Sequence, residues 1–219
     1  SENNYEYTVS WIDCMATGKN RGRGIFIRGN HAKGGSIKKD YIKQKNPSIR
    51  VPFDAPAWAL NKFSIKAFNE AYYHKQLTKL KMVKQGFNPF FYPLDAVGDW
   101  NRIYGKKGLL QYQCIIPIEY VNELIQLFDK IARSGQGSFL AVLKRFGNIP
   151  SPGLMSFPAE GYTLCLDFRN IGKKSRDLFQ ELDRIVLRAG GRLYPAKDAL
   201  MSAETFQLSY PQWTEFARF

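Results

Sequence analysis

From Leu109 onward, the sequence alternates strand-like and helix-like segments in the order β-α-β-β-α-β. The predicted strands cover residues 109–116, 138–146, 162–168 and a last strand that begins with RLYPA (192–196). The predicted helices cover 118–135 and 175–189, and the second opens at Ser175 and ends at Gly190–Gly191. This order is that of a ferredoxin-like split unit. We therefore expect an α+β fold, with an antiparallel sheet that carries helices on one face.

Side chains alternate between the two faces of a strand, so this topology predicts which residues lie under the helices. The helix-covered face should collect Tyr112, Cys114, Ile116, Phe139, Ala141, Leu143, Tyr162, Leu164 and Leu166. The opposite face should collect Gln111, Gln113, Ile115, Leu140, Val142, Lys144, Thr163, Cys165 and Asp167. Amides, a lysine and aliphatic groups on one face are typical of a substrate cleft. An ordinary solvated face of an antiparallel sheet is the alternative.

The first half of the chain, residues 1–108, has a less regular pattern than residues 109–219. We expect a hairpin from 5–14 and 23–30, a long loop over 31–57, a helix over 61–75, a strand over 80–84 and a region of turns and short helices over 87–108. This half therefore predicts an N-terminal hairpin and a helical extension beside the ferredoxin-like unit.

Composition indicates a folded globular protein, because 44% of the residues are hydrophobic and 15% are aromatic. No apolar run approaches the ~20 residues that span a bilayer, and the first residues, SENNYEY, do not resemble a signal peptide. The three cysteines, Cys14, Cys114 and Cys165, are far apart in the sequence, which favours free thiols in a reducing compartment over disulfides or a metal site. We expect a cytoplasmic protein.

Basic residues concentrate between Gly18 and Arg50 in a chain of net charge +13. This segment, 18–50, holds ten lysines and arginines and one acid, Asp40. Such a block attracts polyanions or an anionic membrane surface, while a solvated basic loop is an equally open interpretation.

Motifs that would support catalysis by this chain alone are absent from the sequence. It has no phosphate-binding glycine loop, no HExxH or CxxC motif and no nucleophile elbow, and His31 and His74 are expected at the surface. An RNA-recognition module would place aromatic residues on the open face of the sheet. EGYTLCLDF has Leu164 where one is expected, and Tyr162 is predicted to face the core. The sequence therefore gives the RNA-binding hypothesis little support.

Two stretches resemble a known family: FFYPLDAVGDWNRIYGKKGLLQYQCIIP and RLYPAKDALMSAETFQLSYPQW. They are similar to the C-terminal, substrate-side half of FAD-linked oxidoreductases of the vanillyl-alcohol-oxidase type, and most of all to the decaprenylphosphoryl-ribose 2'-oxidase group and the sugar-lactone oxidases. YTVSWIDC and GRGIFIRGNHA resemble the first hairpin of that half. The resemblance implies that the chain is a fragment that ends early at Phe219, and that its main partner is the FAD-binding domain absent from it.

The resemblance also implies roles for particular residues. Gln111 and Gln113 would face the flavin and the substrate, Lys144 would line the pocket beside Val142, and Cys165 would match a pocket cysteine. Thr163 stands where relatives have an asparagine. Lys197 would lie beside the reacting hydroxyl and the flavin, and Tyr194 would lie near the cofactor. All the positions on the three strands fall on the predicted open face.

The reaction implied by the resemblance is oxidation of a secondary alcohol on a sugar, with FAD as the cofactor and Lys197 as the catalytic residue. Lys197 would orient the hydroxyl and stabilise oxyanion charge, or accept the proton; the sequence leaves both roles open. A lipid-linked sugar would bring the basic segment 18–50 to the inner membrane as a peripheral contact. A non-catalytic interaction domain with the same fold is the remaining alternative.

Overall fold

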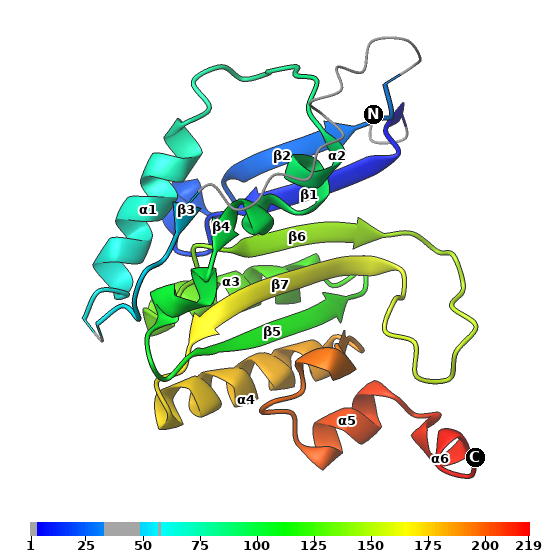
Figure 1. Ribbon diagram of the computed structural model, residues 1–219. Coiled ribbons are helices and arrows are strands. Elements are labelled where there is room, and N and C mark those ends of the chain that lie inside the picture. The colour runs from blue at the N-terminus through cyan, green and yellow to red at the C-terminus, as the bar shows by residue number, and fades with distance from the viewer. Residues whose placement is uncertain (1–3, 33–48, 57) are drawn as a thin grey trace.

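The computed structural model describes residues 4–32, 49–56 and 58–219. Its main sheet has six strands in the order β2-β1-β6-β7-β5-β8, and every pairing in it is antiparallel (Figure 1). The strands are β1 (Tyr7–Ile12), β2 (Gly24–Gly29), β5 (Leu109–Ile116), β6 (Ala141–Phe146), β7 (Gly161–Arg169) and β8 (Arg192–Leu193). The predicted α+β class is confirmed.

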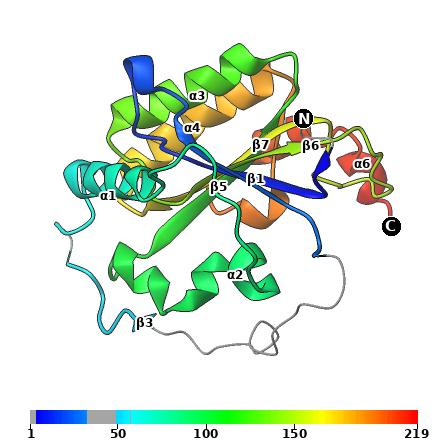
Figure 2. The same cartoon turned by 90° about the horizontal axis from the view of Figure 1, so that it is seen from above.

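The C-terminal half forms the predicted ferredoxin-like unit, β5-α3-β6-β7-α4-β8. Helices α3 (Val121–Ser134) and α4 (Lys173–Arg188) both cover the same side of the sheet (Figure 2). The hairpin β1–β2 extends this sheet because β1 pairs with β6. One sheet thus runs across both parts of the chain, and the division into 1–108 and 109–219 stays a prediction.

The hydrophobic core lies between the sheet and helices α3 and α4. From the strands it receives Tyr112, Cys114, Ile116, Ala141, Leu164, Leu166 and Phe168, and from the helices Leu124, Leu127, Phe128, Ile131, Leu178, Phe179, Leu182, Ile185 and Val186. The ring of Tyr112 meets that of Phe179 edge to face at 5.0 Å. The helix-covered face is therefore confirmed along β5 and β7 and at Ala141.

Helix α4 begins and ends through backbone contacts. Gly190 has a left-handed φ of 66°, which lets the N–H of Gly191 donate to the carbonyl of Val186 at 2.9 Å, so the predicted stop is confirmed. The predicted cap at Ser175 is wrong, because Gly172 holds the N-cap position. Ser175 is buried in the first turn, where its Oγ accepts from the N–H of Ile171 at 3.0 Å.

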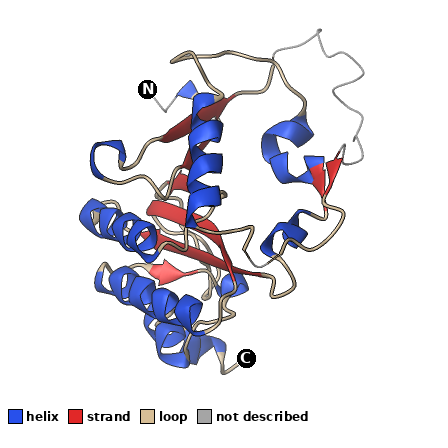
Figure 3. Ribbon diagram, turned by 90° about the vertical axis from the view of Figure 1, so that its left-hand side faces the viewer, coloured by secondary structure: helices blue, strands red, loops and turns tan. Residues whose placement is uncertain are grey.

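The N-terminal half adds one long helix and a set of short elements. Helix α1 (Lys62–His74) is confirmed and opens with a capping box between Asn61 and Ser64. The short elements are β3 (Ile49–Arg50), α2 (Phe87–Phe91), 3-10 helix η4 (Pro93–Ala96), β4 (Val97–Gly98) and 3-10 helix η5 (Trp100–Tyr104). Helix α2 lies on the side of the sheet opposite α3 and α4 (Figure 2), and Figure 3 shows the sheet between these two groups of elements.

Three further local predictions are wrong. Residues 80–84 form no strand and present their side chains to solvent. Phe139 does not join the core under α3 and α4, because the chain ahead of β6 bends at Phe139 and the ring packs on Phe68 and Tyr104. The last strand is only two residues long, because proline has no N–H to pair and Pro195 begins 3-10 helix η6 (Pro195–Lys197). Most of the predicted loop 31–57 lies outside the described residues.

The chain after η6 folds back to hold β8 in place. It forms α5 (Ala203–Ser209) and α6 (Trp213–Phe216). The hydroxyl of the buried Tyr210 donates to the carbonyl of Leu193 at 2.6 Å. This bond pairs a carbonyl at the edge of the sheet and fixes the strand that leads to Lys197.

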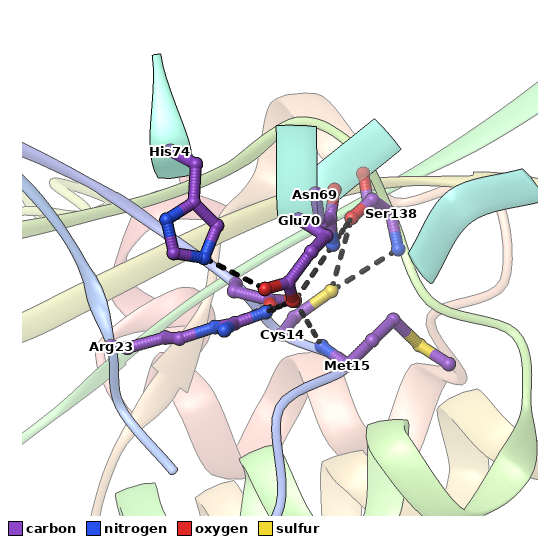
Figure 4. Close-up of polar contacts among 8 residues, drawn as sticks. Cys14, Met15, Arg23, Asn69, Glu70, His74 and Ser138 are labelled. Carbon is purple, nitrogen blue, oxygen red and sulfur yellow. Dashed lines mark hydrogen bonds and ion pairs between the residues drawn. The ribbon is translucent and has the colours of Figure 1, made fainter. Parts of the chain in front are cut away.

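A buried polar network joins the hairpin to α1 and to the chain before β6 (Figure 4). The carboxylate of Asp13 accepts from Arg23 at 2.7 and 2.9 Å and from Asn69 at 2.8 Å. The thiol of Cys14 donates to the carbonyl of Ser138 at 3.2 Å, and burial raises its pKa to about 12. Asp13 and its neighbour Cys14 therefore connect the hairpin to two segments that are far away in sequence.

We predict that Arg23→Met lowers the free energy of unfolding by about 3 kcal/mol, because it leaves the buried carboxylate of Asp13 without its charged partner. The matched control is Arg21→Met, which removes a more exposed ion pair with Asp129 and should cost less than about 1 kcal/mol. Urea denaturation measures both values. Equal losses for the two variants would contradict this role of Asp13.

We also predict that the stability depends on pH through Asp183, which lies under the sheet and accepts from the hydroxyl of Tyr112 at 3.0 Å. Burial raises the pKa of Asp183 from its ordinary 3.8 to about 6. The folded protein then holds this proton to a higher pH than the unfolded chain does, so ionisation destabilises the fold as the pH rises from about 4 to 6. Asp183→Asn should therefore stabilise the protein by about 2 kcal/mol at pH 7.

This gain should disappear when the unfolding is measured near pH 4, where Asp183 is protonated in the folded protein. Asp177→Asn, on the exposed side of the same helix, is the control. A gain of the same size at both pH values would show that Asp183 does not carry a buried charge.

Candidate active site

The face of the sheet away from α3 and α4 carries the polar side chains that the sequence predicted for it. Antiparallel pairing brings together Gln111 with Asp167, Gln113 with Cys165, Val142 with Cys165, and Lys144 with Thr163. None of these side chains belongs to the core under the helices. The predicted position of both glutamines on the open face is therefore confirmed.

Lys197 reaches this face from outside the strands. It ends the 3-10 helix η6, and its Nζ donates to Oε1 of Gln111. On the other side of the amide, Nε2 of Gln111 donates to Oδ1 of Asp167 at 2.8 Å. The structure thus brings the predicted site residues Lys197 and Gln111 together, and a continuous line of hydrogen bonds runs from the ammonium to a carboxylate.

The two charged partners fix the orientation of the Gln111 amide. An ammonium can only donate and a carboxylate can only accept, so Oε1 must point to Lys197 and Nε2 to Asp167. The neutral amide therefore separates the two charges and transmits the position of one to the other.

Asp167 is the member of this line that the sequence analysis did not count among the site residues. It is only 2% exposed, and among the described residues no donor pairs with its Oδ2. Burial raises the pKa of this carboxyl, while the hydrogen bond from Gln111 and the charge of Lys197 oppose the rise. The sequence did offer a signal for Asp167 as a site residue: it is the one acid on the predicted open face.

Cys165 and Lys144 lie in the electrostatic field of the same charges. Burial and, to a smaller extent, the charge of Asp167 raise the pKa of the Cys165 thiol to about 11, while Lys197 and Lys144 oppose the rise. Lys144 itself is exposed, and Val142 beside Cys165 is half-buried. The site residues of β6 and β7 therefore lie near one another and near Lys197.

Gln113 and Thr163 interact with each other. Nε2 of Gln113 donates to Oγ1 of Thr163 at 3.3 Å, and Thr163 is buried. The threonine at this position thus orients the second amide of the face.

Tyr194 lies at one end of the open face, and other parts of the chain cover that end. Its N–H donates to the carbonyl of Gln113 at 2.9 Å, and its ring lies 4.8 Å from that of Phe157. The loop that carries Phe157 is fastened by Arg192, which donates to the carbonyl of Ser156 at 3.1 Å. The open face is therefore closed at the Tyr194 end.

Tyr104 in η5 also carries a buried hydroxyl. The sequence analysis did not single out this residue. Its ring stacks on that of Phe139 at 5.5 Å. Burial raises the pKa of Tyr104, and the charge of Asp167 raises it further. Tyr104 therefore lies within the field of Asp167, although it comes from an element outside the sheet.

Other kinds of site have no support in the described part of the chain. Over residues 4–32, 49–56 and 58–219, no cluster of three or more histidine, cysteine or acidic side chains could hold a metal ion. In the same residues, no helix is both long and apolar enough to cross a bilayer. Tyr162, which an RNA-recognition module would need on the open face, packs against the core instead.

We predict that Cys165 reacts slowly with iodoacetamide, because only its thiolate is nucleophilic and a pKa of about 11 leaves little thiolate at pH 8. The rate, measured by mass spectrometry, should be about 100-fold below that of a free cysteine, whose pKa is ~8.5. Asp167→Asn should accelerate the reaction, because it removes a charge that raises this pKa. Asp177→Asn, far from the site, should leave the rate unchanged, and an equal rate in Asp167→Asn would contradict the coupling.

Comparison with known proteins finds relatives along the whole chain. No family model matches the sequence. A decaprenylphosphoryl-β-D-ribose oxidase from Mycolicibacterium smegmatis is 40% identical over 226 aligned residues, which cover 100% of this chain and 48% of that protein. A Streptomyces coelicolor protein described as an uncharacterized protein in the mprA 5' region is 25% identical over 224 residues, which cover 97% of this chain and 60% of that protein.

The chain therefore spans about half the length of the curated relatives that it matches. The residues that carry the resemblance in the sequence, around Gln111 and Lys197, are also the residues that the fold brings together. This chain is similar, from its first residues to its last, to about half of a decaprenylphosphoryl-β-D-ribose oxidase.

Proposed function

We propose that this chain is the substrate-side part of an FAD-dependent oxidoreductase that oxidises a secondary alcohol on a sugar. The observation that carries the proposal is the line Lys197–Gln111–Asp167 on the open face of the sheet. A relative that is 40% identical along the whole chain is named as an oxidase of a lipid-phosphate-linked ribose, and this supports a substrate of that class. The cofactor would be held mainly by a domain outside this chain.

The residues of the open face fit a flavin. The ring system of FAD has carbonyl oxygens, ring nitrogens and an imide N–H along its polar edge, so it needs both donors and acceptors. The half-buried amide of Gln113 offers both, the ammonium of Lys197 donates, and Tyr194 offers an aromatic ring. When bound, FAD supplies the redox chemistry by accepting a hydride from the carbinol carbon. Gln113, Lys197 and Tyr194 would contact it.

Lys197 would bind the reacting hydroxyl. One of its three N–H groups is committed to Gln111, which leaves two for the oxygen of a substrate. A positive charge at that oxygen stabilises the negative charge that develops when the hydroxyl proton passes to a general base. The hydrogen bond to Gln111 keeps the ammonium in place, so Lys197 orients the hydroxyl and stabilises the oxyanion. The alternative role, in which a neutral Lys197 accepts the proton, is open as well.

Asp167 would act through Gln111 as a positioning residue. Its carboxylate holds the amide with Oε1 toward Lys197, and its negative charge offsets the lysine charge beside the reaction. Without Asp167 the Nε2 group of Gln111 would lose its acceptor, and the ammonium of Lys197 alone would hold the amide less firmly. The buried carboxylate therefore selects one geometry of the site.

The substrate would extend along the exposed part of the face, away from the end closed at Tyr194. Val142 and Cys165 provide an apolar wall, and the exposed ammonium of Lys144 suits a phosphate group. The basic segment 18–50 would meet a lipid-linked phosphate at the inner membrane, although residues 33–48 of it lie outside the described residues. Cytoplasmic location remains part of the proposal.

The proposal predicts that the full-length protein containing this chain is yellow and is bleached under anaerobic conditions by a lipid-phosphate-linked or soluble pentose with a free secondary hydroxyl. Lys197→Met should keep the flavin and lower the limiting rate of bleaching by at least ~100-fold, because the oxyanion loses its charged donor. Lys144→Met should weaken substrate binding with a smaller effect on the limiting rate. Stopped-flow absorbance measures both.

Two further variants make this test specific. Asp167→Asn should also lower the limiting rate, by ~10-fold, because it loosens the orientation of Gln111. Lys106→Met, an exposed lysine outside the line of hydrogen bonds, is the matched control and should bleach at the unaltered rate. A colourless full-length protein, or bleaching of Lys197→Met at the unaltered rate, would contradict the proposal.

A further inference from the structure

The segment that follows α1 and ends at the first residue of α2, residues 75–87, has a surface that the proposed function does not use. It has no regular secondary structure from residue 76 to residue 86 apart from turns and bends. In Figure 1 it arches over the top of the molecule, above β2. We call residues 75–87 the arch.

The apolar side chains of the arch are exposed to a degree that is unusual for a folded protein. Leu77 is 93% exposed, Met82 86%, Leu80 66% and Val83 62%. Four large aliphatic groups within seven residues thus lie outside any core of the described structure. Apolar side chains gathered in this way mark a surface that is buried in a complex.

The charges of the arch are all positive. Its exposed cations are Lys75, Lys79, Lys81 and Lys84. The sequence has no acid between Glu70 and Asp95 that could balance them. The lysines alternate with the aliphatic residues, so a partner must accept apolar side chains and cations in the same narrow strip.

We propose that the arch binds the surface of a lipid bilayer that contains anionic lipids. Leucine, methionine and valine side chains enter the boundary between headgroups and acyl chains, and lysine stems lie along it while their ammonium groups reach the phosphates. Each lysine near an anionic leaflet adds to the attraction. This inference does not rest on the proposed oxidoreductase activity.

The composition of the arch favours a bilayer over a protein partner. Protein interfaces are enriched in arginine, tyrosine and tryptophan, and they are depleted of lysine, which loses its hydration there. From residue 75 to residue 87 the arch has four lysines, no arginine and no tryptophan. Anionic lipid headgroups leave the ammonium groups hydrated, so they suit these residues better.

Co-sedimentation of the purified full-length protein with vesicles tests the proposal. The protein should sediment with phosphatidylcholine vesicles that contain phosphatidylglycerol, and less with phosphatidylcholine alone. Lys79→Gln/Lys81→Gln/Lys84→Gln should weaken partitioning about 100-fold, the effect expected from three lysine charges. Leu77→Ser/Leu80→Ser/Met82→Ser, which leaves the charge unchanged, should also abolish most of the binding.

A matched control distinguishes an effect of the lysines of the arch from an effect of the net charge of the protein. Lys106→Gln/Lys107→Gln/Lys174→Gln removes the same charge from exposed positions elsewhere and should reduce binding far less. Equal losses in the two lysine variants, or no binding of the unaltered protein to anionic vesicles, would overturn the proposal.

An environment-sensitive dye on Met82→Cys distinguishes the bilayer from other occupants. Its emission should shift to the blue only when anionic vesicles are added. An emission that is already blue-shifted in vesicle-free solution would mean that another part of the full-length protein, or a second copy, covers the arch, and would overturn the proposal. None of these measurements needs a flavin or a substrate, so their outcome is independent of the proposed activity.

Discussion

The pairing of β5 with β7 is the constraint on which both faces of the sheet depend. Eight residue pairs join the two strands in a fixed antiparallel register. A shift by one residue would move the two glutamines under α3 and α4 and expose Tyr112 and Cys114, because alternate side chains change faces together. The burial of the aromatic and aliphatic set thus places the amides opposite Asp167 and Cys165. The core determines the geometry of the candidate site without contributing a residue to it.

A buried carboxylate has different surroundings on the two faces of the sheet. Asp183 has the hydroxyl of Tyr112 as a donor, and burial is the main influence on its pKa. Burial is also the main influence on the pKa of Asp167 and raises it, but the hydrogen bond from the Gln111 amide and the charge of Lys197 oppose the rise. A neutral donor leaves most of the desolvation uncompensated, whereas a nearby cation offsets it. The open face therefore holds a carboxylate and an ammonium that one amide connects, an arrangement that an apolar core does not favour.

The period of the hydrophobic residues was enough to predict the ferredoxin-like half, since only one alternation of β5 hides Tyr112 and Cys114. It also placed Gln111 and Gln113 on the open face. The sequence did not reveal that Asp167 joins Gln111 to Lys197, because a hydrogen bond across paired strands depends on register and on rotamers. The strand expected at 80–84 failed for a related reason. Leu80 and Met82 alternate as in a strand, but none of the strands in the described residues pairs with them, and pairing rather than alternation makes a sheet.

The open face of the sheet is covered only in part by this chain. On the helix side, the core residues of β5 and β7 lie beneath α3 and α4, while on the other side the cover reaches Tyr194 and leaves Lys144 exposed. An orphan carboxylate oxygen, a charged lysine and two oriented amides are costly to keep ordered unless another group uses them. The relatives that the chain matches are about twice its length or somewhat less. A polar face that is ordered before a ligand binds spares the complex the entropy of arranging it.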